Sequence, residues 1–405
     1  MIGSITQEVI FHGRQRNECW FEPSAALVPA GRNGAVPQIM VTTAQLTGCD
    51  MGPHHYTWTR DFGQRWSNPA ESQGLQVNPV DGDLFEKPWV SPFYHAGSDT
   101  VLMIGRTCFS QDLLPTSQIK GEMHALWHPR SRGRNLVYDL IYSRWDPELG
   151  DCVPWQRIAW QHLFDQPEGL ALFTSDVCER VELADGSILS PSTLRGADKV
   201  GQTVVVRLQW DGTTLSAVER GNVLRCGDER GLHEPSLVRF GDRYYLTIRN
   251  DLRGYVSQSD DGLHFSDPQP WCFDDGEELG SYNTQQHWLA FGGALHLVYT
   301  RRSELNNGVV RSRAPLYIAE VDPERCCVLR DTERVVIPEN GARMGNFCTL
   351  NVTPDEAWVI TGEWLQQRIP GYTKDMPFFA DADRGASAYN RIQYIGDLLL
   401  ARLRA

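Results

Sequence analysis

One turn of the chain reads Thr59-Arg60-Asp61-Phe62-Gly63-Gln64-Arg65-Trp66. It fits the pattern S/T-x-D-x-G-x-x-W at every defined position. A short carboxylate can accept hydrogen bonds from the backbone of its own turn, and glycine readily adopts the positive φ that such a turn requires. The tryptophan can then pack between neighbouring sheets. The sequence therefore predicts a tight acidic turn within a β-sheet protein.

A weaker copy of this turn reads Gln258-Ser259-Asp260-Asp261-Gly262-Leu263-His264-Phe265. At the same spacing it keeps an aspartate, the glycine and an aromatic residue, and it loses the leading hydroxyl. Turns of this kind are the Asp boxes of β-propellers, so two copies in one chain indicate a repeat architecture.

Runs of alternating polar and apolar residues, separated by Gly, Asn and Asp turns, divide the chain into about six similar units. The units begin near Ser24, Trp89, Val181, Ser236, Gln286 and Phe347. A long insert at 110–133 leaves seven units as an alternative. We therefore expect residues 1–405 to form one all-β domain, a six-bladed or seven-bladed β-propeller. Residues 5–11 are apolar enough to close the ring beside the C-terminal strands.

Composition narrows the function. The chain has 405 residues, 13 tryptophans and a net charge of −13, and this acidity argues against a nucleic-acid binder. No apolar run is long enough to span a membrane, and the N-terminus does not resemble a signal peptide, so we expect a cytoplasmic protein. The ten cysteines are scattered and predict free thiols. No metal-ligand motif is present, so no cofactor is expected.

The segment His233-Glu234-Pro235-Ser236-Leu237-Val238, followed by Arg249 and the second acidic turn, resembles the sialidase superfamily. Sialidases carry a Glu before an inner strand of this blade, an Arg at the end of the next strand and then an Asp box. Two departures argue against sialidase activity itself. Phe21-Glu22-Pro23 places an acid where the family has a carboxylate-binding Arg, and Gly345-Asn346-Phe347-Cys348 places Phe347, which has no hydroxyl, near the family's Tyr nucleophile.

A closer resemblance is to the propellers that act on uronate-containing glycans, among them rhamnosyl-glucuronate hydrolases and polysaccharide lyases. The segments that carry it are Gly52-Pro53-His54-His55-Tyr56, Arg311-Ser312-Arg313-Ala314-Pro315-Leu316-Tyr317 and Glu339-Asn340-Gly341-Ala342-Arg343-Met344-Gly345-Asn346-Phe347. This resemblance implies a lone His as the acid or base. His55 is the candidate, since imidazole titrates near neutral pH, although a structural His in a turn explains the residue equally well.

Glu234 is the strongest candidate carboxylate, because it precedes an inner strand, and His233 beside it is a second acid–base candidate. Arginines match the geometry of a carboxylate, and several lie at strand ends or beside turns. The predicted substrate-binding residues are Arg106, Arg249, His287, Arg301, Arg313, Arg343 and Glu363. Each arginine alone has a surface ion pair as its alternative explanation, and Glu363 has a capping role against Trp364.

These patterns predict an exo-acting glycoside hydrolase on uronate-containing oligosaccharides. A polysaccharide lyase that eliminates at a uronate is one alternative, and a non-catalytic glycan-binding propeller is another. The expected partner is an oligosaccharide rather than nucleic acid or a membrane.

Overall fold

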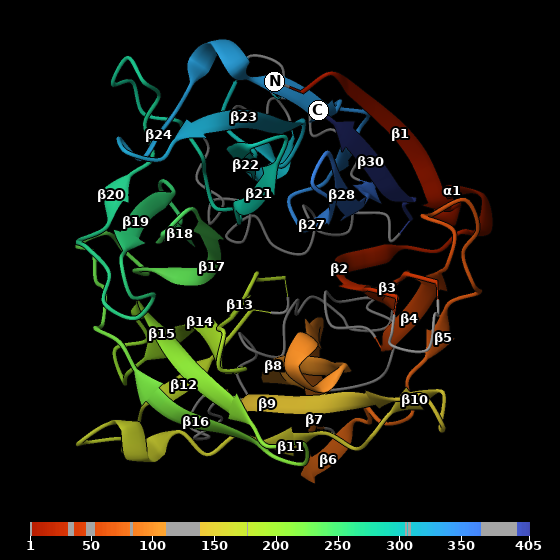
Figure 1. Cartoon of the computed structure of the whole chain (residues 1–405), viewed down its shortest axis with the longest axis vertical. Coiled ribbons are helices and arrows are strands. Elements are labelled where there is room, and N and C mark those ends of the chain that lie inside the picture. The colour runs from red at the N-terminus through yellow and green to blue at the C-terminus, as the bar shows by residue number, and fades with distance from the viewer. Residues whose placement is uncertain are drawn as a thin grey trace.

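The computed structural model describes residues 2–30, 36–45, 53–81, 84–110, 138–175, 177–303, 306, 309–365 and 395–405. These residues form six antiparallel sheets arranged around a central axis, so the chain is a six-bladed β-propeller (Figure 1). Of the two blade numbers predicted from the sequence, six is confirmed. Nearly all of the predicted insert at 110–133 lies outside the described residues.

Three blades have a simple order of strands from the axis outward. Blade 1 contains β2 (Trp20–Val28), β3 (Gln38–Gln45), β4 (His54–Thr59) and β5 (Ala70–Glu71). Blade 4 contains β17 (His233–Phe240), β18 (Arg243–Arg249), β19 (Tyr255–Ser259) and β20 (Gln269–Pro270). Blade 5 contains β21 (His287–Phe291), β22 (Ala294–Tyr299), β23 (Leu316–Asp322) and β24 (Cys327–Val328) in this order, and β25 (Arg334–Ile337) also pairs with β23.

Blades 2 and 3 are less regular. Blade 2 contains β7 (Leu84–His95), β8 (Thr100–Ser110), β9 (Leu140–Asp146), β10 (Asp151–Cys152) and β11 (Gln156–Arg157), and β6 (Asn78–Asp81) pairs with β7. In blade 3 the first strand is broken into β12 (Ala171–Phe173) and β13 (Val181–Glu182), which both pair with β14 (Ile188–Arg195). Strands β15 (Gly201–Trp210) and β16 (Leu215–Arg220) complete it. The sequence prediction began this unit at Val181 and so missed β12.

The two ends of the chain close the ring in blade 6. Strand β1 (Ser4–Phe11) pairs along its length with β30 (Leu398–Arg404), beside β28 (Glu356–Gly362) and β27 (Phe347–Thr353). The predicted closure by residues 5–11 is confirmed. The remaining elements are short: α1 (Gly13–Arg16), η1 (Ala96–Ser98), η4 (Gln161–Leu163), η6 (Val310–Ser312), η7 (Arg330–Thr332), and a ladder of β26 (Ala342–Arg343) with β29 (Trp364–Leu365).

The core lies between blades rather than at the axis. Six apolar clusters fill the six interfaces between neighbouring sheets. Their largest fully buried members include Trp160, Trp271, Trp288 and Trp358. Each sheet buries both faces in this way, and the sequence therefore needs many large apolar side chains.

The two acidic turns make equivalent hydrogen bonds. In the first, Thr59 Oγ1 donates to Asp61 Oδ1 at 3.0 Å and accepts from Gly63 N at 2.7 Å. In the second, Ser259 Oγ donates to Asp261 Oδ1 at 3.0 Å and accepts from Gly262 N at 2.9 Å. The prediction that the second turn lacks the leading hydroxyl is therefore wrong. Ser259 and Asp261 take these places, and the turn is one residue shorter between the aspartate and the glycine.

Nine cysteines lie in the described residues, and all nine are free thiols. Within the same residues, no helix has the length and apolar character needed to cross a membrane.

Candidate functional site

The candidate site lies at the rim of the ring where the first strand of each blade begins and the second strand ends. His233 at the start of β17 pairs with Arg249 at the end of β18, which fixes both at this rim. Glu234 has a positive φ of 50° and lies in a bulge, because the register shifts between His233 and Ser236. Its backbone N–H donates to Thr193 Oγ1 of blade 3 at 3.1 Å instead of joining the ladder of β17. A bulge of this kind re-aims a side chain out of the regular pleat.

Glu234 and Arg249 form an ion pair at this rim, with only 15% and 7% of their side chains exposed. Gln285 Nε2 also donates to Glu234 Oε2, at 2.8 Å. Burial by itself raises the pKa of Glu234, but the charges of Arg249 and Arg106 and the hydrogen bond from Arg249 lower it more. The resulting pKa lies well below the ordinary value for a glutamate. Glu234 is therefore ionised at neutral pH and lacks the proton that a general acid would donate.

Arg313 joins the same network from the segment before β23. Its Nη1 donates to Asn346 Oδ1 at 2.6 Å and its Nη2 to the backbone oxygen of Asn283 at 3.1 Å. Arg249 Nη2 donates to Asn283 Oδ1 at 2.6 Å, so Asn283 links the two arginines. Burial lowers the pKa of Arg313, and the charges of Arg311, Arg249 and Arg343 lower it further.

Gly345 makes room for the Arg313 side chain. A Cβ at this position would lie 2.6 Å from Arg313 Cγ and Cδ and from Thr284 Oγ1. Such a contact is far inside van der Waals distance, so a larger residue here would displace the guanidinium.

Glu22 of blade 1 ends the network. Asn346 Nδ2 donates a hydrogen bond to Glu22 Oε1, so a continuous chain of contacts runs from Glu234 through Arg249, Asn283, Arg313 and Asn346 to Glu22. Glu22 has a positive φ of 47° and lies at a register shift between Phe21 and Ser24. Both glutamates are followed by Pro-Ser, and both lie in the first strand of their blade. Blades 1 and 4 are opposite each other in a ring of six, so the two carboxylates come from opposite sides.

Arg343 and Glu363 lie beside this network at the entrance to blade 6. The Arg343 guanidinium stacks on the ring of Trp364 at 3.6 Å from its centroid. Glu363 is 1% exposed and accepts hydrogen bonds from Arg14 Nε at 2.7 Å, from Arg14 Nη2 at 2.8 Å and from Asp397 N at 3.0 Å. Glu363 therefore ties the N-terminal and C-terminal segments together, which is a different role from the predicted contact with substrate.

A second group of arginines lies where blades 2 and 3 meet the same rim. The guanidinium carbons of Arg106 and Arg195 lie 5.5 and 5.2 Å from the ring centroid of Phe173, and Arg106 also lies 5.5 Å from that of Tyr138. Burial lowers the pKa of Arg195 to about 10, and the charges of Arg230 and Arg106 contribute to the lowering. Arg195 was not predicted, although it ends the second strand of its blade as Arg249 does.

Arg301 lies outside both groups. Its guanidinium makes a two-pronged ion pair with Glu333, with Nε–Oε2 at 2.8 Å and Nη2–Oε1 at 2.7 Å. It also packs at 5.0 Å from the ring centroid of Tyr317. Arg301 therefore forms an ion pair, which was the alternative explanation for each predicted arginine.

Among the described residues, none of the three predicted histidines makes a hydrogen bond to a member of this network, although His233 pairs with Arg249 in the strand ladder. His55 is in β4, the third strand of blade 1, where Nδ1 lies 3.0 Å from Pro53 O and the ring contacts Trp20. The alternative interpretation of His55 as a structural turn residue matches these contacts. His233 is 1% exposed, and burial together with Arg230 and Arg249 lowers its pKa well below the ordinary value. A neutral, enclosed imidazole of this kind is poorly placed to donate a proton.

His287 begins β21 and faces a different carboxylate. Its Nδ1 lies 3.0 Å from Glu179 Oε2, while Thr349 Oγ1 donates to Glu179 Oε1 at 2.5 Å. The His287 ring also packs edge-on against Phe347, which is fully buried. Phe347 therefore belongs to the core, and Asn346 is the residue of that segment that reaches the network.

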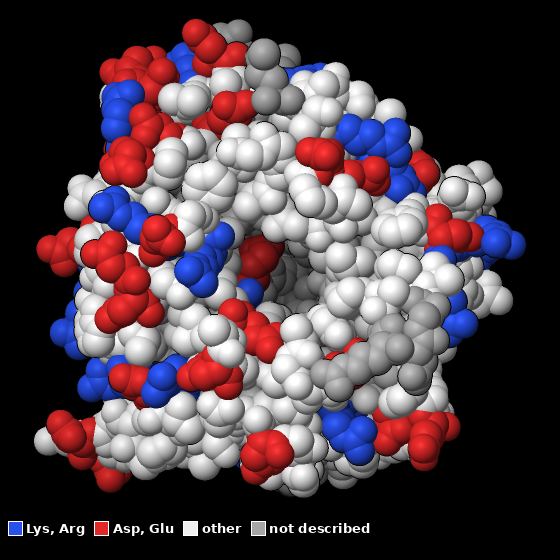
Figure 2. Space-filling model, viewed as in Figure 1, with Lys and Arg blue, Asp and Glu red and all other residues white. Residues whose placement is uncertain are grey.

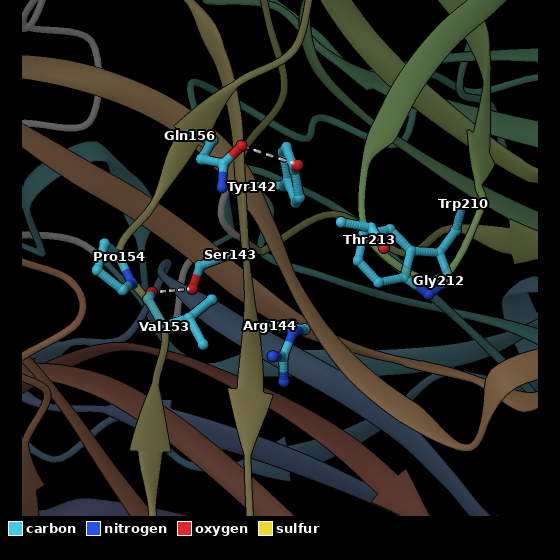
Figure 3. Close-up of a pocket in the computed structure, with 9 residues that line it drawn as sticks. All are labelled: Tyr142, Ser143, Arg144, Val153, Pro154, Gln156, Trp210, Gly212 and Thr213. Carbon is cyan, nitrogen blue, oxygen red and sulfur yellow. Dashed lines mark hydrogen bonds between the residues drawn. The ribbon is translucent and has the colours of Figure 1, made fainter. Parts of the chain in front are cut away.

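The molecule is hollowed at the centre of the ring on the face shown in Figure 2, with acidic and basic side chains on the wall of the hollow. A separate cavity of about 270 Å³ lies between the third strands of blades 2 and 3, lined by Tyr142, Arg144, Gln156 and Trp210 among others (Figure 3). It contains none of the predicted site residues. Among the residues that the structure describes, no three His, Cys, Asp or Glu side chains are grouped as a metal site.

No protein-family model matches the sequence, and no curated protein matches it. Solved structures do match. A protein of unknown function from Dyadobacter fermentans has 12% identity and a TM-score of 0.60, with 100% of each chain covered. The Hadza microbial sialidase Hz136 has 10% identity and a TM-score of 0.56, covering 88% of this chain and 66% of that one.

The sialidase of Trypanosoma rangeli has 11% identity and a TM-score of 0.52, covering 95% of this chain and 55% of that one. This chain thus spans about half the length of the trypanosomal enzyme. At these identities the similarity establishes the propeller fold, which these sialidases share.

Proposed function

We propose that the protein is a glycoside hydrolase that releases a sugar from the end of a uronate-containing oligosaccharide. The observation that carries the proposal is the pair Arg249 and Arg313, which are 6% and 5% exposed and are linked by Asn283. Bringing guanidinium groups together out of water costs free energy, and a bound carboxylate would offset that cost. A guanidinium also matches a carboxylate in a two-pronged geometry.

Glu234 is the proposed general base. Arg249 and Gln285 both donate to its Oε2, and among the described residues its Oε1 accepts no hydrogen bond. An ionised oxygen beside the proposed carboxylate site could take a proton from an attacking water.

Glu22 is the proposed second carboxylate. Hydrolysis of a glycosidic bond generally uses two carboxyl groups that flank the bond. Glu22 and Glu234 supply them from opposite blades, at matching bulges and at the two ends of one network. In this mechanism Glu22 protonates the departing sugar while Glu234 activates water.

A non-catalytic glycan-binding protein is the second candidate. It is favoured by one observation: Glu22, the proposed acid, accepts a hydrogen bond from the side-chain amide of Asn346. Such a contact stabilises the ionised form and disfavours a protonated carboxyl.

The test is digestion of a panel of uronate-containing, rhamnosyl-glucuronate and sialyl oligosaccharides. Released sugar and the ultraviolet absorbance of an unsaturated uronate are followed in the same reaction. Free sugar without rising absorbance supports hydrolysis, whereas rising absorbance would identify a lyase and contradict the proposal. Binding without any product would identify a glycan-binding protein.

Three variants separate the proposed roles. Glu234→Gln should lower turnover about 100-fold or more on every substrate, because a base is needed whatever the leaving group. Glu22→Gln should lose a similar factor on natural saccharides but much less on a nitrophenyl glycoside, which departs without protonation. His55→Ala is the matched control and should retain most activity, since its contacts are to Trp20 and Pro53.

A further inference from the structure

Within the described part of the chain, Arg195 forms no ion pair with a carboxylate. Among the residues that the structure describes, it has neither a hydrogen bond nor an ion pair, and its aromatic contact is the ring of Phe173 at 5.2 Å. The neighbouring arginines differ in this respect: Arg230 Nη1 lies 2.9 Å from Asp251 Oδ1, and Arg249 is paired with Glu234. A desolvated charge of this kind is costly unless a ligand completes its contacts.

Arg106 lies close enough to Arg195 to repel its charge, and both guanidinium groups lie near the Phe173 ring. Tyr138 and Phe173 form an apolar wall beside them, with Phe173 only 2% exposed. Two guanidinium groups held beside aromatic rings present their N–H edges in fixed directions, which suits an oxyanion better than a neutral sugar hydroxyl.

Glu234 lies between the arginine group of blades 2 and 3, which contains Arg195, and the pair of Arg249 and Arg313. The charges of Arg249 and Arg106 both lower the pKa of its carboxylate, and the charge of Glu234 acts in turn on Arg195 and Arg313. Its backbone N–H also bonds to Thr193, two residues before Arg195 in β14. A ligand centred on Glu234 would therefore have a cationic group at each end.

We infer that Arg195 and Arg106 form a second oxyanion subsite and that the ligand carries two acidic groups on adjacent sugars, one on each side of Glu234. This rests on the proposed function, in which Arg249 and Arg313 hold the first carboxylate. The second group is a sulfate ester or a further carboxylate, since either oxyanion accepts hydrogen bonds from guanidinium.

The test compares the binding of three disaccharides by calorimetry: a glucuronate disaccharide with one carboxylate, the same disaccharide with a sulfate ester on the second sugar, and a diuronate. The wild-type protein should bind at least one doubly acidic compound about tenfold or more tightly than the singly acidic one. Arg195→Gln should remove most of this preference, and Arg195→Lys should restore part of it. The sulfated and diuronate compounds together identify which oxyanion the subsite prefers.

Arg207→Gln is the matched control, because it removes the same charge from blade 3 at an exposed ion pair with Glu219. It should leave the preference unchanged, and a thermal melt should show that every variant folds. The inference is overturned if the wild-type protein binds all three compounds equally, if it binds none of them, or if Arg195→Gln and Arg207→Gln have the same effect. The readout is a ratio of affinities, so a protein that binds with this preference but releases no product would contradict the proposed hydrolysis alone.

Discussion

The carboxylate of Glu234 and the guanidinium of Arg249 form an enclosed ion pair where β17 begins and β18 ends. The pair exists because a bulge at Glu234 turns its side chain out of the pleat, toward the arginine at the end of the neighbouring strand. The charge of Arg106 also lowers the pKa of this carboxylate. Glu234 therefore interacts with arginines of both groups at this rim.

Removing that anion should destabilise the fold. Glu234→Gln leaves Arg249 and its cationic neighbours without a partner, and breaking an enclosed pair by removing one charge should lower the free energy of unfolding by about 3 kcal/mol. Chemical denaturation measures the change. Glu219→Gln, in an exposed pair with Arg207, should cost less than about 1 kcal/mol. Equal losses in the two variants would show that the Glu234 pair is no more than a surface contact.

The second acidic turn offers a comparison of two adjacent aspartates. Asp261 Oδ1 accepts from Leu263 N at 2.8 Å and from His264 N at 2.7 Å, whereas Asp260 is exposed and 3.4 Å from Arg243 Nε. Asp261→Ala should lower the free energy of unfolding by about 2 kcal/mol. Asp260→Ala should change it by less than about 0.5 kcal/mol. The opposite order would restore the alignment on Asp260 that the sequence suggested.

Stability should fall in mild acid because of His54. This ring is 7% exposed and lies edge-on to Trp89, and its burial lowers the pKa to about 4 from an ordinary value of 6.5. Between pH 6.5 and 4 the unfolded chain therefore binds a proton that the folded protein does not. Stability should decrease as the pH falls through this window, by up to about 3 kcal/mol from this group.

His54→Asn tests that assignment by denaturation at several pH values. The variant should show a shallower loss of stability between pH 6.5 and 4, although His296, whose pKa burial also lowers to about 4, keeps part of the dependence. An unchanged slope in the variant would mean that His54 does not stay neutral in the folded protein.

Glu363 should behave as a structural residue. Glu363→Gln weakens the two-pronged contact with Arg14, so we expect the free energy of unfolding to fall by about 2 kcal/mol while KM for an acidic saccharide stays the same. A double-mutant cycle with Arg14→Gln should show coupling between the two positions. A raised KM with unchanged stability would instead return Glu363 to the substrate pocket.

Most of the fold could be predicted from the sequence, because the sequence features of a propeller are local. The acidic turn at Thr59, the alternating runs and the apolar N-terminal segment each predict one piece of the ring, and each piece is found. The broken first strand of blade 3 was missed because β12 has three residues, too few for a period-2 pattern. The leading hydroxyl of the second turn was missed because a one-residue deletion shifts the alignment.

Only part of the candidate site could be predicted from the sequence. A residue at a strand end is expected at the rim of the ring, but the sequence does not show where its side chain points. Arg249 and Arg313 point into one network, whereas Arg301, which follows the end of the equivalent strand β22, points to Glu333. Glu22 was noticed only as a departure from a family pattern. The signal that places it is the repeated Glu-Pro-Ser at Glu22 and Glu234, with the same bulge and positive φ in opposite blades.

Recognition of a carboxylate by Arg249 and Arg313 is tested by comparing the binding of one uronate disaccharide with that of its methyl ester. The ester keeps the sugar and removes only the charge. We predict that wild-type protein binds the acid about 100-fold more tightly than the ester, and that Arg313→Gln loses most of this difference. Equal affinity of the wild-type protein for acid and ester would show that Arg249 and Arg313 do not recognise the carboxylate.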